Sequence, residues 1–490
     1  MFLIIKIELP AENSNCNSNN GTHLKNSGGS IPFSVIVAAL TKIENTKGEG
    51  SKDTMKEVLS NLFNEILLKT PEDLSRVYYF LLSKVGPEYK SPELGIGTGI
   101  LEKVVAKAIG KSDKHIKEKM VELGDLALVA MEGKKTLGTM EKYQGFVTSN
   151  NKKDMTLKQV IDNFVELANI KGKSSQAEKE KILVKLLFNA NKEEVKYIIR
   201  SLQKGLKIGA SLKTIVAALA RTISRIYSNS SKIGSKSKSN LQSQITLDEK
   251  EAERIILISM NQLCDEDIVF QNLIDVITAR DNFSNLIEKC KITPGVPVKP
   301  QLARPTTGLK VIFQRFDGVP FTCEYKYDGF RGQVHHYAVE GPGSKITFKT
   351  EIFSRNLENM TDSYPDIVEY LDKIHSEKVN SFILDCEIVA FDSKNGKILP
   401  FHQLTTRARK NVNVKEISIN VCMFVFDILY LNNEVIIEKT LEDRRNILRE
   451  NFEETEKIQI AKSVSSEKFE EIEGFMNEAI AAGIIINEIY

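Results

Sequence analysis

Hydrophobic residues from about residue 31 to residue 291 recur at the spacing of amphipathic helices. One such segment is DTMKEVLSNLFNEILLKT, residues 53–70, whose apolar side chains fall on a single helical stripe: Met55, Val58, Leu59, Leu62, Phe63, Ile66 and Leu67. Similar stripes occur in LKQVIDNFVELANI, KEKILVKLLFNA and EEVKYIIRSLQKG. The pattern predicts an all-α domain over residues 31–291.

Two segments of the chain lack such a stripe. Residues 11–30 are mostly Asn, Ser and Gly, so we predict a disordered lead-in over residues 1–30. The tract SNSSKIGSKSKSNLQSQ, which begins at residue 228, is rich in serine and lysine. It predicts a flexible basic loop over residues 228–246.

The pattern changes after residue 291. The segment ITPGVPVKP, residues 292–300, contains three prolines and predicts a linker. Short runs that mix β-branched and aromatic residues follow it: FTCEYKY, KITFKTEIFS, SFILDCEIVAFD and VCMFVFDILYL. We therefore predict a multidomain chain in which the all-α domain precedes an α+β domain over residues 292–490.

The stretch FTCEYKYDGFRGQVHH, residues 321–336, places a lysine between two tyrosines. The period of a strand puts Glu324 and Lys326 on the same face. Asp328 and Gly329 predict a hairpin turn directly after this strand. Two interpretations remain open, a solvated lysine on an edge strand or a reactive lysine beside a carboxylate and the guanidinium of Arg331.

Composition and charge narrow the class of protein. A length of 490 residues favours two or three domains. No apolar run reaches the roughly 18 residues that a membrane crossing needs, so we expect an intracellular protein. The six cysteines form no C-x-x-C pair, which argues against a zinc knuckle or a disulfide framework. A formal net charge of +2 neither requires nor excludes nucleic acid.

Three later stretches carry further candidate chemistry. EIFSRN contains Arg355, FILDCEIVAFD contains Asp385 and Glu387 on one strand face, and CMFVFDILYL contains Phe424 and Phe426. Each has an ordinary alternative when taken alone. The arginine could pair with a surface acid, the glutamate could be solvated, and paired phenylalanines are more often core residues.

Taken in order, these stretches resemble the nucleotidyltransferase motifs of ATP-dependent DNA ligases, and the eukaryotic replicative type in particular. EYKYDGFR resembles the motif K-x-D-G-x-R, and EIFSRN, FILDCEIVAFD and VCMFVFDILYL resemble the blocks that follow it. SPELGIGTGIL, GLKIGASLKTIVAALA and PGVPVKPQLARPTTG resemble the DNA-binding domain and its junction, and LEDRRNILRENF also looks like family sequence. The resemblance covers roughly residues 31–480.

The resemblance implies a reaction and a nucleophile. Lys326 would attack the α-phosphate of ATP and form a lysyl-AMP, whose AMP then passes to the 5′-phosphate of a nick and is displaced by the 3′-hydroxyl. A free lysine with a pKa of roughly 10.4 is almost wholly protonated at pH 7, so such a nucleophile needs nearby cations and desolvation. The resemblance implies Mg²⁺ as cofactor beside ATP, with Asp328 and Glu387 as its carboxylates.

The resemblance also implies nucleotide contacts for four other residues. Glu324 matches the residue that reads the adenine amino group, and Phe426 matches the ring stacked on adenine. Arg331 and Arg355 match residues that hold the ribose and phosphates, for which a planar guanidinium suits oxygen pairs. Glu387 is alternatively a ribose ligand.

For the helical half the resemblance implies that the chain encircles nicked duplex DNA. In KGLKIGAS, Gly205 and Gly209 would let backbone amides approach phosphates, and Lys204 and Lys207 would add positive charge. The alternative is a helix-ending turn with two solvated lysines. We expect a monomer in the nucleus with no membrane partner, and a sliding clamp is a further candidate partner, although no clamp-binding peptide is visible near the amino end.

The carboxyl end departs from the family pattern. The motif E-G-L-M-V-K should fall at residues 482–487, where Ala482 replaces the glutamate and Asn487 replaces the lysine. The K-x-K motif and an OB-fold domain would lie beyond Tyr490, so we expect a C-terminally truncated ligase that adenylates itself poorly. Two alternatives stay open: an mRNA capping or RNA ligase type of nucleotidyltransferase, and a non-catalytic remnant that binds nicked DNA.

Overall fold

The computed structural model describes the following residues: 29–46, 48, 50–90, 94–136, 154–170, 172, 174–233, 247–301, 309–316, 321–341, 345–374, 379–407, 417 and 419–481. The expectations for the lead-in before residue 29, for the loop over residues 234–246 and for Ala482 and Asn487 lie outside these ranges. Within them, no helix combines the length and the apolar character that crossing a membrane would require.

Helices build the first half of the chain, and no strand occurs among its described residues. They are α1 (Phe33–Glu44), α2 (Ser51–Lys69), η1 (Pro71–Asp73), α3 (Leu74–Leu81), α4 (Thr98–Ile109), α5 (Asp113–Leu123), α6 (Leu126–Thr136), α7 (Leu157–Asn169), α8 (Ser175–Asn189), α9 (Lys192–Leu202), α10 (Leu212–Ile233), α11 (Glu249–Gln262), α12 (Glu266–Ala279) and α13 (Asn285–Lys289). Capping boxes begin α7 at Thr156 and α9 at Asn191. The predicted apolar stripes meet in one hydrophobic core, which we call the core of the helical half.

Helix α10 corrects one boundary of the predicted basic loop. The loop was expected from residue 228, yet the helix continues to Ile233. Tyr227 is buried, packs edge-on against Phe283 at 5.9 Å between ring centres, and donates a hydrogen bond to the carbonyl oxygen of Asp281 at 2.8 Å. Once the helix is fixed by packing at Tyr227, each further helical residue adds one backbone hydrogen bond. The helix therefore continues through the serine and asparagine residues that follow.

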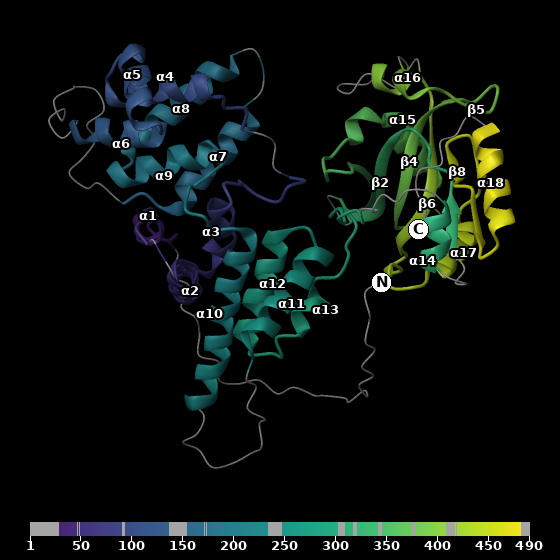
Figure 1. Cartoon of the computed structure of the whole chain (residues 1–490), viewed down its shortest axis with the longest axis horizontal. Helices are drawn as coiled ribbons and strands as arrows, with labels where there is room; N and C mark the ends of the chain where they lie inside the picture. Colours follow the sequence, from purple (N-terminus) through teal and green to yellow (C-terminus); the bar gives the residue numbers. More distant parts are fainter. Residues whose placement is uncertain are drawn as a thin grey trace.

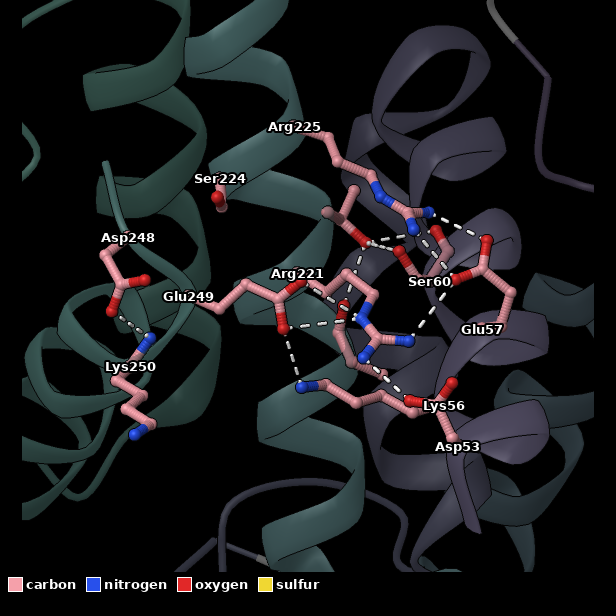
Figure 2. A network of polar contacts seen from close by, with 12 residues as sticks. Asp53, Lys56, Glu57, Ser60, Arg221, Ser224, Arg225, Asp248, Glu249 and Lys250 are labelled. Atoms are coloured by element: carbon pink, nitrogen blue, oxygen red, sulfur yellow. Dashed lines mark hydrogen bonds and ion pairs between the residues drawn. The ribbon is translucent and has the colours of Figure 1, made fainter. Parts of the chain in front are cut away.

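A polar network ties α10 to α2 and α11 (Figure 2). Arg221 of α10 lies 2.8 Å from Asp53, 3.3 Å from Glu57 and 3.1 Å from Glu249. Arg225, one turn later, makes two hydrogen bonds of 2.8 Å to the carboxylate of Glu57. Such forked pairs fix direction as well as distance, so they set the angle at which α10 lies between its neighbours.

The second half of the chain is an α+β unit that lies beside the helical half (Figure 1). Its strands are β1 (Phe321–Glu324), β2 (Phe330–Glu340), β3 (Ile346–Ser354), β4 (Phe382–Asp392), β5 (Lys397–Ile398), β6 (Val421–Leu431), β7 (Glu434–Val435), β8 (Ile458–Ile460) and β9 (Ser463–Ser466). Its helices are α14 (Leu309–Phe316), η4 (Thr361–Ser363), α15 (Pro365–Ile374), α16 (Phe401–Thr406), α17 (Leu441–Asn451) and α18 (Phe469–Ala481). The larger sheet has the order β3-β2-β4-β6-β7, with β5 paired to β4 and β8 parallel to β6, while β1 and β9 form a second, two-stranded sheet.

The predicted hairpin after β1 is wrong. β1 pairs with β9, and the chain crosses at Asp328 and Gly329 to enter the larger sheet as β2. A Cβ atom at Gly329 would lie 2.4 Å from the backbone oxygen of Ile388. Glycine is therefore required because the chain passes tightly over β4 at this crossing, and not because a two-residue turn needs a left-handed backbone.

Candidate active site

A cavity of about 440 Å³ opens where strands of both sheets meet. Six of the residues singled out in the sequence line it: Glu324, Lys326, Arg331, Arg355, Glu387 and Phe426. They come from β1 and the residues after it, from β2, from the turn after β3, from β4 and from β6. Asp328, to which the resemblance gives a role in metal binding, is exposed and is not among the residues that line the cavity.

Strand register explains how residues far apart in the sequence meet here. In the β2–β4 ladder, Arg331 lies directly opposite Glu387. In the β4–β6 ladder, Glu387 lies opposite Phe424. Residues opposite each other on neighbouring strands have their side chains on the same face, so one guanidinium, one carboxylate and one ring fall in a row across the sheet.

A β-bulge interrupts the pairing of β6 with β4 at Phe426. Asp385 of β4 pairs with Asp427 and the next residue, Cys386, pairs with Val425, so Phe426 has no partner of its own in the β4 ladder. The extra residue also shifts the alternation, because Val425 and Ile428 are three apart and still pack in the same core. Phe426 is two residues after Phe424 and so keeps the same face of β6, where it is partly exposed in the cavity wall.

The buried carboxylate of Asp385 holds the side chain of Arg331 in place. Its guanidinium donates to Asp385 at 2.7 Å and lies 5.3 Å from the ring centre of Phe426. Burial raises the pKa of the Asp385 carboxyl group, and the positive charge of Arg331 opposes that shift. The pair therefore fixes the guanidinium against the aromatic wall of the cavity.

The linker over residues 292–300 is hydrogen-bonded to β2, the strand that carries Arg331. The backbone N–H of Val298 donates to the side-chain oxygen of Gln333 at 2.7 Å, and the Gln333 amide lies 3.3 Å from Asp385. The N–H of Gly295 donates to Nδ1 of His335 at 3.0 Å. Burial lowers the pKa of His335 to about 3, so its ring is neutral and Nδ1 is free to accept that hydrogen bond.

The two tyrosines beside Lys326, Tyr325 and Tyr327, anchor the backbone of this segment. Both are buried, and Tyr327 stacks on Phe424 with 3.9 Å between ring centres. The N–H of Tyr325 donates to the backbone oxygen of Lys462 at 3.0 Å, and the N–H of Lys462 donates to the Tyr327 hydroxyl at 3.3 Å. The backbone is thus anchored on both sides of Lys326, whose own side chain is exposed at the cavity.

Sequence reasoning did not find the partner of Glu324. This carboxylate is buried and forms an ion pair with Arg445 of α17, which is also buried. Burial and the neighbouring charge of Arg449 lower the pKa of Arg445 to about 10, which still leaves it protonated at neutral pH. Arg445 lies in the segment LEDRRNILRENF, far from β1 in the sequence. No local sequence pattern predicts that this segment packs against β1, so only the three-dimensional structure reveals the ion pair.

The segment KGLKIGAS forms the exit from α9. Lys204 has a left-handed backbone with φ of 60°, and the N–H of Gly205 donates to the Arg200 carbonyl at 3.0 Å, which ends the helix. Gly209 is also left-handed, with φ of 68°, whereas Gly205 is not. Lys204 and Lys207 are both exposed, and the ammonium of Lys207 also pairs with Asp125.

A network of buried charges supports this exit segment. Asp125 lies 3.1 Å from the ammonium of Lys207 and 3.1 Å from the guanidinium of Arg200. Arg200 also donates to Glu44 at 2.9 Å, which joins α1 to α9. Burial would raise the pKa of Asp125, but the hydrogen bonds from Lys207 and from the N–H of Ala127, together with the positive charges of Arg200 and Lys207, lower it. The segment is therefore fixed to the helical half by charge-assisted contacts.

Two families of known domains match the chain. Residues 300–486 match the ATP dependent DNA ligase domain, and residues 32–220 match the DNA ligase N terminus. The chain is 36% identical over 457 residues to DNA ligase 1 of Arabidopsis thaliana, which is 93% of this chain and 54% of that protein. It is 36% identical over 453 residues to DNA ligase 1 of Schizosaccharomyces pombe, which is 92% of this chain and 55% of that protein.

An archaeal relative is matched over more of its length. The chain is 30% identical over 459 residues to the DNA ligase of Pyrobaculum islandicum, which is 93% of this chain and 68% of that protein. By contrast, the chain spans about half the length of the two eukaryotic relatives.

Proposed function

The chain belongs to the ATP-dependent DNA ligase family, and on that premise we propose that it seals nicks in duplex DNA through a lysyl-AMP intermediate on Lys326. One observation supports this proposal above the others. A single cavity gathers from distant parts of the sequence the side chains of Lys326, Arg331, Arg355, Glu324, Glu387 and Phe426. That set suits a nucleoside triphosphate whose phosphorus is attacked by an amine.

The proposed first step is a transfer of AMP to the lysine side chain. The unprotonated amine of Lys326 attacks the α-phosphorus of ATP, a P–N bond forms, and the P–O bond to pyrophosphate breaks. The 5′-phosphate at a nick then takes the AMP and frees the lysine, and the adjacent 3′-hydroxyl displaces AMP to close the strand. The anchored backbone on both sides of Lys326 would keep the amine in line with the bond that breaks.

The other cavity residues have proposed roles in holding the nucleotide. Phe426 would stack on the adenine, and Arg331, fixed by Asp385, would bind ribose or phosphate oxygens with little loss of side-chain freedom. Arg355 is exposed at the turn after β3 and would contact phosphate oxygens. Glu387, opposite Arg331, would accept hydrogen bonds from the ribose or hold a metal ion.

Mg²⁺ fits the cavity only together with the substrate. Among the described residues, no three Asp, Glu, His or Cys side chains come together as a metal site. Mg²⁺ usually keeps several waters and uses one or two carboxylates plus substrate phosphates, and the half-buried Glu387 suits that arrangement. Bound Mg²⁺ would neutralise charge on the phosphates. Asp328, at the exposed crossing between the sheets, remains a candidate for metal contact in the later steps.

We propose nicked duplex DNA as the partner of the helical half. The exposed lysines Lys204 and Lys207 and the left-handed Gly209 would approach phosphates without reading the base sequence. Binding would then weaken as salt rises. Nuclear location, a monomeric state and recruitment by a sliding clamp rest on the resemblance alone. The match of residues 32–220 to a DNA ligase N terminus supports DNA over RNA as the substrate.

Sealing of a nicked duplex tests the proposal. The purified chain is incubated with ATP, Mg²⁺ and a duplex that carries a labelled 5′-phosphate at one nick, and the strands are separated under denaturing conditions. We expect a longer labelled strand with the wild-type chain and none with Lys326→Ala. Lys394→Ala, which changes an exposed lysine in the turn after β4, is the matched control and should seal as wild type does. Equal sealing by Lys326→Ala would refute the proposal.

A further inference from the structure

Two adjacent arginines on α17 connect the two sheets. Arg444 makes two hydrogen bonds of 2.7 Å to the carboxylate of Asp427 in β6, which belongs to the larger sheet. Arg445, the next residue, pairs with Glu324 in β1, which belongs to the two-stranded sheet. Only 7% of Arg445 and 8% of Glu324 is exposed. A paired charge at this depth persists only where the partner is held in place, so the pair fixes β1 relative to α17.

Arg445 occupies one oxygen of the Glu324 carboxylate. Oε1 is buried and carries the ion pair with Arg445. Glu324 nevertheless lines the cavity, directly before the anchored segment that holds Lys326. The remaining oxygen, Oε2, is therefore the one that a nucleotide in the cavity could meet.

We propose that Arg445 is a positioning residue that keeps Glu324 ionised and oriented, so that the cavity accepts a purine with a 6-amino group and rejects a purine with a 6-oxo group. This inference rests on the proposed function and names the origin of its base specificity. An ionised carboxylate can only accept hydrogen bonds. At the 6 position, the carboxylate therefore accepts a hydrogen bond from the amino group of adenine. A 6-oxo oxygen has only lone pairs there, and the carboxylate has no hydrogen to donate to it.

Removal of the guanidinium would change the hydrogen-bonding character of Glu324. A buried carboxyl group without a cationic partner favours its neutral form, which can donate as well as accept. The neutral acid would bind a 6-oxo purine as readily as adenine. The other charged residues that line the cavity with Glu324 are Lys326, Arg331, Arg355, Glu358 and Glu387. The charge of Arg449 acts on Arg445.

The test compares the affinities of ATP and ITP, which differ at the 6 position of the base. Binding to the full chain is measured by calorimetry from pH 6 to pH 9 for the wild type, Arg445→Met, Arg445→Lys and Glu324→Gln. We expect the wild type to prefer ATP by roughly 10-fold to 100-fold, the worth of a hydrogen bond to a charged group. In Arg445→Met the preference should fall to near one at pH 6 and return as pH rises and Glu324 ionises.

The other variants separate positioning from general damage. Glu324→Gln can donate and accept at every pH, so it should lose the preference without any recovery at high pH. Arg445→Lys keeps a cation and should keep part of the preference at every pH. Arg444→Met removes the neighbouring contact to Asp427 and should leave the ratio of the two affinities unchanged, even if the protein becomes less stable.

Three outcomes would overturn the inference. Arg445→Met with native circular dichroism and an undiminished preference at pH 6 would refute it while the proposed function stands. If that variant does not fold, an undiminished preference in Glu324→Gln would refute it in the same way. A wild-type chain that binds neither nucleotide would refute both the inference and the proposed function.

Discussion

Glu44 is the hub of the network that supports the α9 exit, and its replacement by glutamine offers a quantitative test of that network. The carboxylate accepts hydrogen bonds from Lys196 at 2.9 Å, from the Tyr197 hydroxyl at 2.7 Å and from Arg200 at 2.9 Å. Burial alone would raise the pKa of Glu44, but these hydrogen bonds outweigh it and lower the pKa to about 2. Glu44→Gln removes the charge while keeping the size of the side chain.

The magnitude follows from the shift of the Glu44 pKa. A fall from 4.5 to about 2 corresponds to about 3 kcal/mol of unfolding free energy, and the partial exposure of the carboxylate reduces this to about 2 kcal/mol. Because the folded-state pKa lies below the unfolded value, the stabilisation is fully present above about pH 5 and is lost as pH falls toward 2.

Urea unfolding followed by far-ultraviolet circular dichroism measures this effect, because helices dominate the signal. We expect Glu44→Gln to be less stable than wild type by about 2 kcal/mol at pH 7. The difference should shrink by roughly half at pH 3, since the wild type then loses part of its advantage. Lys69→Gln, which removes an exposed ion pair with Glu65, is the control and should change stability little at either pH. A difference that is the same at both pH values would refute the electrostatic account.

Three other substitutions give further tests. Gly329→Ala forces a methyl group against the backbone oxygen of Ile388 and should destabilise the α+β half by roughly 1–3 kcal/mol in urea unfolding. Gly474→Ala, on a helix with open space around it, is the control and should stabilise this half slightly. Equal effects would contradict the requirement for glycine where the chain crosses β4. Lys207→Met should reduce the slope of log affinity against log salt for nicked duplex by about one, and an unchanged slope would exclude a phosphate contact. Phe426→Leu removes the ring that faces Arg331, so ATP affinity should fall by roughly 10-fold in calorimetry, and an unchanged affinity would argue against stacking.

Local patterns in the sequence were sufficient for much of this account. The apolar stripes predicted the helical half because helix period and burial both act within a few residues. The motif order predicted which side chains would gather, and six of them line one cavity. The fold class of the second half, α+β, also follows from the short runs of β-branched and aromatic residues.

The features that the sequence did not predict all depend on contacts between distant residues. Asp328 and Gly329 carry a hairpin signal, but β1 pairs with β9, which lies more than a hundred residues later. The bulge at Phe426 depends on the register of two strands, and no residue type near it announces the shift. Arg445 is one of several arginines in a charged helix, and only its burial against β1 distinguishes it.

The most direct test of the central claim is the identity of the residue that carries AMP. The chain is incubated with Mg²⁺ and ATP labelled on its α-phosphate, separated under denaturing conditions and mapped by tandem mass spectrometry. We expect acid-labile label on Lys326, whatever its extent, and none on Lys326→Ala. Label that persists in Lys326→Ala, or a wild-type chain that is folded and takes up no label, would contradict it.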